Sequence, residues 1–105
     1  MSRSILVAAA GVVLASGAAP AWASADLARK HACVACHATD KKLVGPSYAD
    51  VAKKYAGQSD AAAKMLASIK AGGSGKWGPV PMPPQAQVPE ADLKALVAWI
   101  LAGAK

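Results

Sequence analysis

Apolar residues recur at intervals of three and four in several segments of the chain, whereas runs that alternate apolar and polar residues are almost absent. The first spacing is typical of amphipathic helices and the second of half-buried strands. The pattern predicts four short helices, over residues 26–34, 47–57 and 59–72 and in a last segment that starts near 89. The sequence therefore predicts an all-α domain.

Local signals mark the ends of these helices. Ser47 is a good N-cap and has Asp50 three residues later, and Gly57 follows the last apolar position of that segment. Pro89 suits the first turn of the last helix. We expect the buried stripes to contain Tyr48, Val51, Ala52 and Tyr55, then Ala62, Met65, Leu66 and Ile69, then Leu93, Leu96, Val97, Ile100 and Leu101.

The segment 72–88 carries no helical pattern, and it is rich in glycine and contains four prolines as well as Trp77 and Met82. A loop of this length inside a small domain is usually functional. Each proline fixes its own φ and biases the preceding residue toward an extended backbone, so the loop is expected to be stiff.

The first twenty-three residues have the composition of a secretory signal peptide. Arg3 precedes an apolar stretch over residues 5–19, and Ala21-Trp22-Ala23 matches a small-x-small cleavage site. The stretch is short for a bilayer span and has no basic flank after it, so we expect no stable membrane insertion. We expect cleavage after Ala23, with Ala25 as the alternative, and export of a single domain over residues 24–105.

The run Cys33-Val34-Ala35-Cys36-His37 is the most specific chemical signal in the sequence. Two thiols on one turn can each add across a haem vinyl group, and the adjacent histidine can then bind the iron; this spacing is typical of c-type haem attachment. A redox disulfide is an alternative, but it usually occurs in a strand-helix context. A zinc site that includes His31 is another, but the sequence has no second Cys/His cluster. We otherwise expect His31 to be a solvated polar position on a helix.

A sixth ligand for such an iron has three methionine candidates. Met1 would leave with the signal peptide, and Met65 lies in an apolar helical stripe, where methionine usually fills the core. Met82 lies in the stiff loop, which would lose little entropy on binding. An open or hydrated iron position, as in haem enzymes and gas sensors, remains the alternative.

The chain is basic, with a net charge of +6. Loss of Arg3 would leave eleven basic and six acidic side chains, a net charge of +5, and two ionised haem propionates would reduce it to about +3. An exported chain without an arginine-rich stripe is not expected to bind nucleic acid. We expect the lysines near the haem motif and the loop to surround an exposed haem edge and to attract an acidic partner. These lysines are Lys30, Lys41, Lys42, Lys70 and Lys76.

Four segments together resemble the short class I cytochromes c of bacteria, in particular the monohaem periplasmic cytochromes that donate electrons to haem-cd nitrite reductase. The segments are residues 33–38 (CVACHA), 44–48 (VGPSY), 55–58 (YAGQ) and 77–84 (WGPVPMPP). The resemblance covers essentially the whole of residues 24–105. It implies a class I cytochrome c fold, with about four short helices around one covalently bound haem c.

The resemblance also implies roles for individual residues. Cys33 and Cys36 would hold the haem, and His37 and Met82 would be the axial ligands of its iron. The carbonyl of Pro46 would accept a hydrogen bond from the free ring nitrogen of His37. In addition, Trp77 would donate its indole N–H to a haem propionate.

Two positions depart from the family pattern. Ser68 stands where relatives usually carry an arginine that helps to hold a propionate, and Gln85 stands where they usually carry an asparagine that reaches the methionine sulfur. The implied ligand set is unchanged by both departures.

The function implied by the resemblance is that of a monomeric periplasmic carrier of single electrons, and not of an enzyme. Its redox partners would be a quinol-oxidising cytochrome bc complex as donor, and nitrite reductase or a terminal oxidase as acceptor. The residues leave the choice between these acceptors open.

Overall fold

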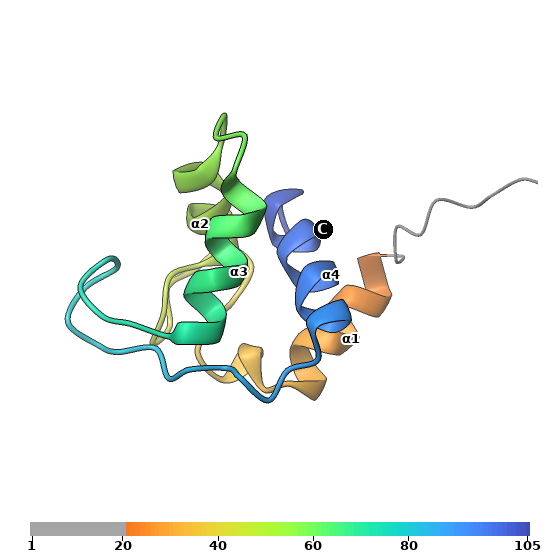
Figure 1. The fold of residues 1–105 in the computed structure, drawn as a ribbon, viewed down its shortest axis with the longest axis horizontal. Helices are drawn as coiled ribbons and strands as arrows, with labels where there is room; N and C mark the ends of the chain where they lie inside the picture. The colour runs from red at the N-terminus through yellow and green to blue at the C-terminus, as the bar shows by residue number, and fades with distance from the viewer. Residues whose placement is uncertain (1–20) are drawn as a thin grey trace, which may run out of the picture.

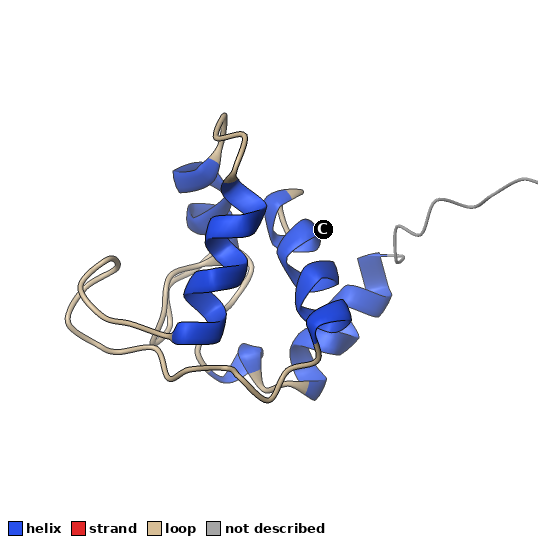
Figure 2. Cartoon of the chain, in the orientation of Figure 1, coloured by secondary structure: helices blue, strands red, loops and turns tan. Residues whose placement is uncertain are grey.

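The computed structural model describes residues 21–105, and its regular structure is helical throughout that part of the chain (Figure 2). The elements are α1 (Ala21–Lys30), the short 3-10 helix η1 (Cys33–Ala35), α2 (Tyr48–Tyr55), α3 (Ala61–Ala71) and α4 (Glu90–Leu101). Strand-like pairing in residues 21–105 is limited to two isolated bridges. The all-α prediction with four helices is confirmed.

Helix α4 is the centre of the fold, since α1, α2 and α3 all pack against it (Figure 1). Leu93 and Val97 on α4 are the most deeply buried large side chains. Met65 on α3 is 3% exposed and belongs to the core, as the sequence predicts. The loop 72–88 leaves α3, extends away from the helices and returns beneath them to α4 (Figure 1).

The predicted helix ends are largely correct for the last three helices. The Ser47 side chain accepts a hydrogen bond from the backbone N–H of Asp50 at 3.1 Å, which caps α2. Helix α3 ends where Gly72 adopts a φ of 66°. Pro89 is the N-cap residue of α4 and not its first helical residue.

The first helix was predicted over residues 26–34, and this prediction is wrong at both ends, since α1 begins at Ala21 and ends at Lys30. Helix α1 ends at Lys30, because Ala32 adopts a left-handed backbone with φ 60° and the chain then turns into η1. Alanine is a good helix former, so its left-handed conformation has no local signal. The predicted signal peptide lies outside the described residues over positions 1–20, and residues 21–23 begin α1.

The expectation of a solvated His31 is also wrong. Its side chain is 12% exposed, and its Nε2 lies 3.0 Å from Oδ2 of Asp92. This contact joins the end of α1 to the first turn of α4. The two residues are 61 positions apart, so the local sequence pattern could not predict that they are in contact.

Candidate functional site

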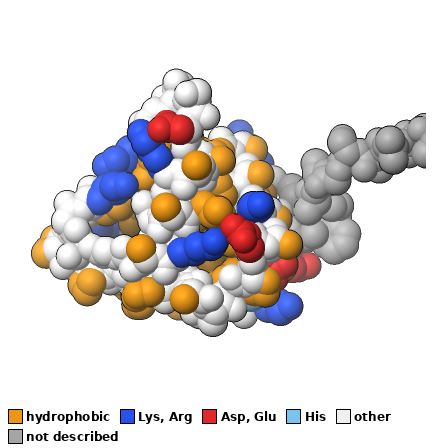
Figure 3. All heavy atoms as spheres, viewed as in Figure 1, with side chains coloured by type: hydrophobic (Ala, Val, Ile, Leu, Met, Phe, Trp, Pro, Cys, Tyr) orange, Lys and Arg blue, Asp and Glu red, His pale blue; other side chains and the backbone are white. Residues whose placement is uncertain are grey.

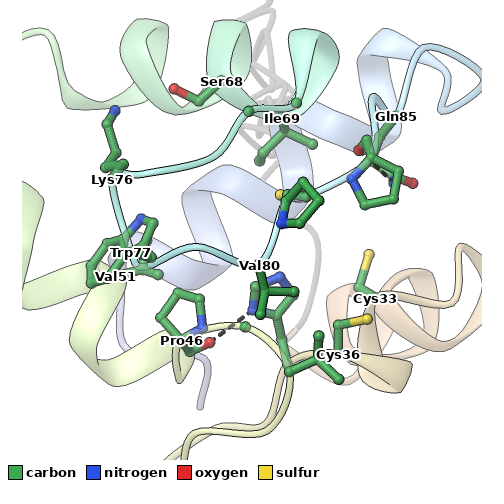
Figure 4. Close-up of a pocket in the computed structure, with 18 of the residues that line it drawn as sticks. Cys33, Cys36, Pro46, Val51, Ser68, Ile69, Lys76, Trp77, Val80 and Gln85 are labelled. Carbon is green, nitrogen blue, oxygen red and sulfur yellow. Dashed lines mark hydrogen bonds between the residues drawn. The ribbon is translucent and has the colours of Figure 1, made fainter.

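A cavity of about 410 Å³ opens between η1, α2, α3, α4 and the loop 72–88. Its walls are mainly apolar and include Val51 from α2, Ile69 from α3 and Val80 from the loop (Figure 4). No carboxylate of the described residues lines it, whereas Lys42 and Lys76 do. A cavity of this size and composition suits a large apolar ligand that carries negative charge at its edge.

The two cysteines line one end of the cavity. The backbone N–H of Cys36 and that of His37 both donate to the carbonyl of Cys33, at 3.2 and 3.0 Å. This tight turn brings the sulfur atoms of Cys33 and Cys36 to the same side of the chain, facing the cavity, and the two thiols are not joined to each other (Figure 4).

The environment of Cys33 does not suit a redox-active thiol. Burial raises the pKa of the Cys33 thiol; its own backbone hydrogen bond opposes this and the nearby Cys36 adds to it. Reactive thiols of redox Cys-x-x-Cys motifs have a lowered pKa instead. The raised pKa of Cys33 is thus the opposite of what a redox-active thiol has.

The ring of His37 is fixed in one orientation. Its Nδ1 donates a hydrogen bond to the carbonyl of Pro46 at 2.7 Å, which is the contact expected from the resemblance (dashed line in Figure 4). With the proton on Nδ1, the lone pair of Nε2 is available to a metal. Tyr48 stacks on the ring with a centroid distance of 5.7 Å and an interplanar angle of 24°.

Gly45 is a further functional position that the sequence reasoning did not identify. A Cβ at this position would lie 2.5 Å from Cε1 and 2.9 Å from Nδ1 of His37. The backbone N–H of Gly45 also donates to the carbonyl of Cys36 at 2.8 Å. Only glycine lets this segment lie against the ring. The sequence signal for this role was the position of Gly45 directly before Pro46.

Met82 lines the same cavity from the loop 72–88. Its backbone is paired with that of Gly73, through hydrogen bonds of 2.8 Å from Met82 N–H and 3.1 Å to Met82 O. Gly72 lies directly against this segment, since a Cβ there would lie 2.5 Å from the Met82 oxygen. The structure thus brings Cys33, Cys36, His37 and Met82 to one cavity.

Trp77 and Gln85 also line the cavity. The Trp77 ring is 38% exposed and has the ammonium of Lys54 4.6 Å from its centroid. The side-chain N–H of Gln85 donates a hydrogen bond to the carbonyl of Pro83 at 3.0 Å, and its Oε1 accepts one from the side chain of Gln87 at 3.0 Å. The Gln85 amide is therefore occupied within the loop.

The five lysines that were expected to surround the haem edge differ in their relation to the cavity. Lys42 and Lys76 line the cavity, but Lys30, Lys41 and Lys70 do not. The ammonium of Lys70 lies 3.0 Å from a carboxylate oxygen of Glu90, so its charge is locally balanced.

The set of donor atoms fits an iron-bearing macrocycle better than a zinc ion. Within residues 21–105, no three His, Cys, Asp or Glu side chains are grouped so as to hold a metal ion. The cavity instead offers two thiols, one oriented imidazole and one thioether among apolar walls. The hydroxyl of Tyr48 is buried and has no hydrogen-bond partner among the described residues. Burial, with a smaller effect of Cys33, raises its pKa to about 12, so the group stays protonated and can donate a hydrogen bond.

Comparison with known proteins agrees with this geometry. The family model for cytochrome c matches residues 23–104. Cytochrome c-552 of Hydrogenobacter thermophilus is 50% identical over 101 residues, which cover 96% of this chain and 97% of that protein. Cytochrome c-552 of Nitrosomonas europaea is 50% identical over 93 residues, covering 89% and 88%. The crystal structure of the wild-type Nitrosomonas protein superposes with a TM-score of 0.73 at 52% identity, covering 75% of this chain and 98% of that one.

These similarities confirm the resemblance to short bacterial class I cytochromes c and the corresponding fold. Proteins of this family carry one covalently attached haem c, and this chain has the two cysteines that such an attachment requires. They transfer electrons to and from redox proteins and are not enzymes. The helices described in residues 21–105 include none that is long and apolar enough to cross a bilayer. The chain is a member of the cytochrome c family and an electron carrier.

Proposed function

We propose that this protein carries single electrons in the periplasm, with His37 and Met82 as the axial ligands of its haem iron. The observation that carries the proposal is that both side chains line one apolar cavity together with the two cysteines. The haem, when bound, supplies reversible one-electron chemistry between its ferric and ferrous states.

The surroundings of His37 and Met82 support this assignment. Pro46 keeps the proton on Nδ1 of His37 and so leaves Nε2 as the only nitrogen that can bind a metal. The paired backbone of Gly73 and Met82 holds the loop in place, so a weak thioether ligand loses little entropy on binding. With both axial positions filled by the chain, no position is left for a substrate.

The proposed cellular setting is export. Residues 1–23 would be a signal peptide, and the mature monomer would begin at Ser24. A quinol-oxidising cytochrome bc complex would donate electrons, and nitrite reductase or a terminal oxidase would accept them. N-terminal sequencing of the periplasmic protein should give Ser24 as the first residue, or Asp26 if cleavage follows Ala25; a retained Met1 would contradict export by cleavage.

The proposed docking surface lies around the mouth of the cavity. Three large apolar side chains that line the cavity are exposed at 38% to 58%, in contrast to the buried core: Val44, Trp77 and Val80. Apolar side chains gather along the edge of the molecule formed by the loop 72–88, and basic ones lie above them (Figure 3). A small apolar patch beside Lys42 and Lys76, for which the described part of the chain supplies no ion pair, suits brief docking of an acidic partner.

Carbon monoxide tests the carrier function against an enzyme or a gas sensor. Because both axial positions are proposed to be filled, adding carbon monoxide to the reduced protein should leave its visible spectrum unchanged at neutral pH. Rapid formation of a carbon monoxide adduct would show an open iron position and would contradict the proposal.

A further inference from the structure

Tyr55, at the end of α2, lies at one end of the cavity beside Lys76 of the loop 72–88. The ammonium of Lys76 donates a hydrogen bond to the Tyr55 hydroxyl at 3.0 Å and lies 5.6 Å from the ring centroid. Ser68 on α3 lines the same cavity. The loop 72–88 thus places Lys76 against Tyr55, which is only 5% exposed.

This end of the cavity has positive charge without a balancing carboxylate. Among the described residues, neither Lys76 nor Lys54 forms an ion pair, whereas Lys64 and Lys70 both do. The effect is visible on Tyr55, where burial alone would raise the pKa of the hydroxyl but Lys76, Ser68 and Lys54 lower it below its usual value. An ammonium has three donors, so Lys76 retains two for an anion.

The cysteines lie at the other end of the cavity from Lys76 and Trp77 (Figure 4). In a haem c, the thioether-bearing edge and the propionate-bearing edge of the macrocycle are on different sides of the iron. If a haem is attached through Cys33 and Cys36, Lys76 would be at the end of the cavity that could hold its carboxylates.

We propose that Lys76, held in place by Tyr55, binds a haem propionate in this chain. In relatives, as the resemblance implies, an arginine at the position of Ser68 helps to hold a propionate. Ser68 cannot take this role, because its side chain is short and uncharged. Lys76 supplies the charge from the loop, and Tyr55 positions it. The inference rests on a haem in the proposed cavity and does not depend on Met82 as a ligand.

The test measures the pKa of each propionate by carbon NMR of protein whose haem carboxyls are isotopically labelled. The charged and titratable groups at this end are Lys54 and Tyr55 from α2 and Lys76 from the loop. An opposite charge within a few ångströms lowers the pKa of a carboxyl, so Lys76→Met should raise that of one propionate by about one unit or more. Tyr55→Phe, which changes no charge near neutral pH, should raise the same propionate pKa by less.

Lys64→Met is the matched control, because it removes the same charge from a position that does not line the cavity. It should leave both propionate pKa values unchanged. Unchanged values in Lys76→Met, or an equal rise in Lys64→Met, would overturn the proposal. The sulfur-to-ferric charge-transfer absorption reports separately on Met82: its absence from the wild-type protein would contradict the proposed ligation and leave the Lys76 assignment to be judged by the propionate values alone.

Discussion

Gly72→Ala is the substitution that most directly tests how the ligand loop is held. Gly72 has φ 66° and ψ −170°, a backbone conformation that is essentially restricted to glycine. A Cβ here would lie 2.5 Å from the oxygen of Met82, 2.7 Å from the nitrogen of Pro84 and 2.9 Å from the carbonyl carbon of Pro83. All three are backbone atoms, so no side-chain rotation can relieve the overlap.

The size of the effect follows from these distances. Ordinary contact begins at 3.4 Å, so the loop must move by about 0.9 Å relative to the end of α3. The backbone strain costs about 1 to 3 kcal/mol, and loss of a hydrogen bond between Gly73 and Met82 costs about 1 kcal/mol. We expect a loss of about 2 to 4 kcal/mol in unfolding free energy, which lowers the Tm by about 10 to 20 °C in a domain of this size.

Thermal unfolding and the visible spectrum of the ferric protein provide the assay. The displaced loop should weaken the sulfur-to-ferric charge-transfer absorption at temperatures where the protein is still folded. Gly57→Ala is the control, since Gly57 also has a positive φ, of 78°, but has no atom within 4 Å of the added Cβ. It should lower the Tm without changing the absorption. A Gly72→Ala protein with wild-type Tm and absorption would refute the reasoning.

Three further predictions concern other parts of the molecule. Ala32→Gly removes the strain of a left-handed alanine (φ 60°), which should stabilise the folded state by about 1 to 2 kcal/mol, but glycine makes the unfolded chain more flexible, which costs about 0.4 to 1 kcal/mol. Chemical denaturation should therefore show an unfolding free energy higher by about 0.5 to 1 kcal/mol, and a lower value would contradict this prediction. His31→Ala leaves Asp92 without its partner and should lower the unfolding free energy by about 1 to 2 kcal/mol at neutral pH; an unchanged value would mean that the contact between α1 and α4 does not depend on this pair. Lys42→Glu should slow electron transfer to an acidic redox partner at low salt far more than Lys64→Glu, because Lys42 lines the cavity and Lys64 does not; equal rates in stopped-flow measurements would place the docking surface elsewhere.

The sequence predicted features that depend on local chemistry. Ser47 caps α2 because a hydroxyl at that position can accept from the N–H of Asp50, whatever the rest of the fold. Met65 is buried because it lies on the apolar stripe of an amphipathic helix. The bond between His37 and Pro46 was expected from the resemblance, and the roles of both residues at the haem remain predictions.

The features that escaped prediction depend on contacts between distant segments. Ala32 favours helix by itself, and its left-handed conformation is set by the turn into η1. His31 is partly buried, with a side chain 12% exposed, only because α4 brings Asp92 to it. Lys76 appears in the sequence as one basic loop residue among others, and its hydrogen bond to Tyr55 exists only once the loop folds back onto α2. Tertiary contacts decide all three, and local pattern does not contain them.

The spectrum and midpoint potential of Met82→His, compared with those of Met65→Leu, test the central claim most directly. A methionine ligand raises the potential of the haem relative to a histidine ligand. Met82→His should therefore lower the midpoint potential and abolish the sulfur-to-ferric charge-transfer absorption. Met65→Leu, a core substitution of similar volume, should leave both unchanged. Loss of the absorption in Met65→Leu, or its persistence in Met82→His, would contradict the assignment of Met82 as the sixth ligand.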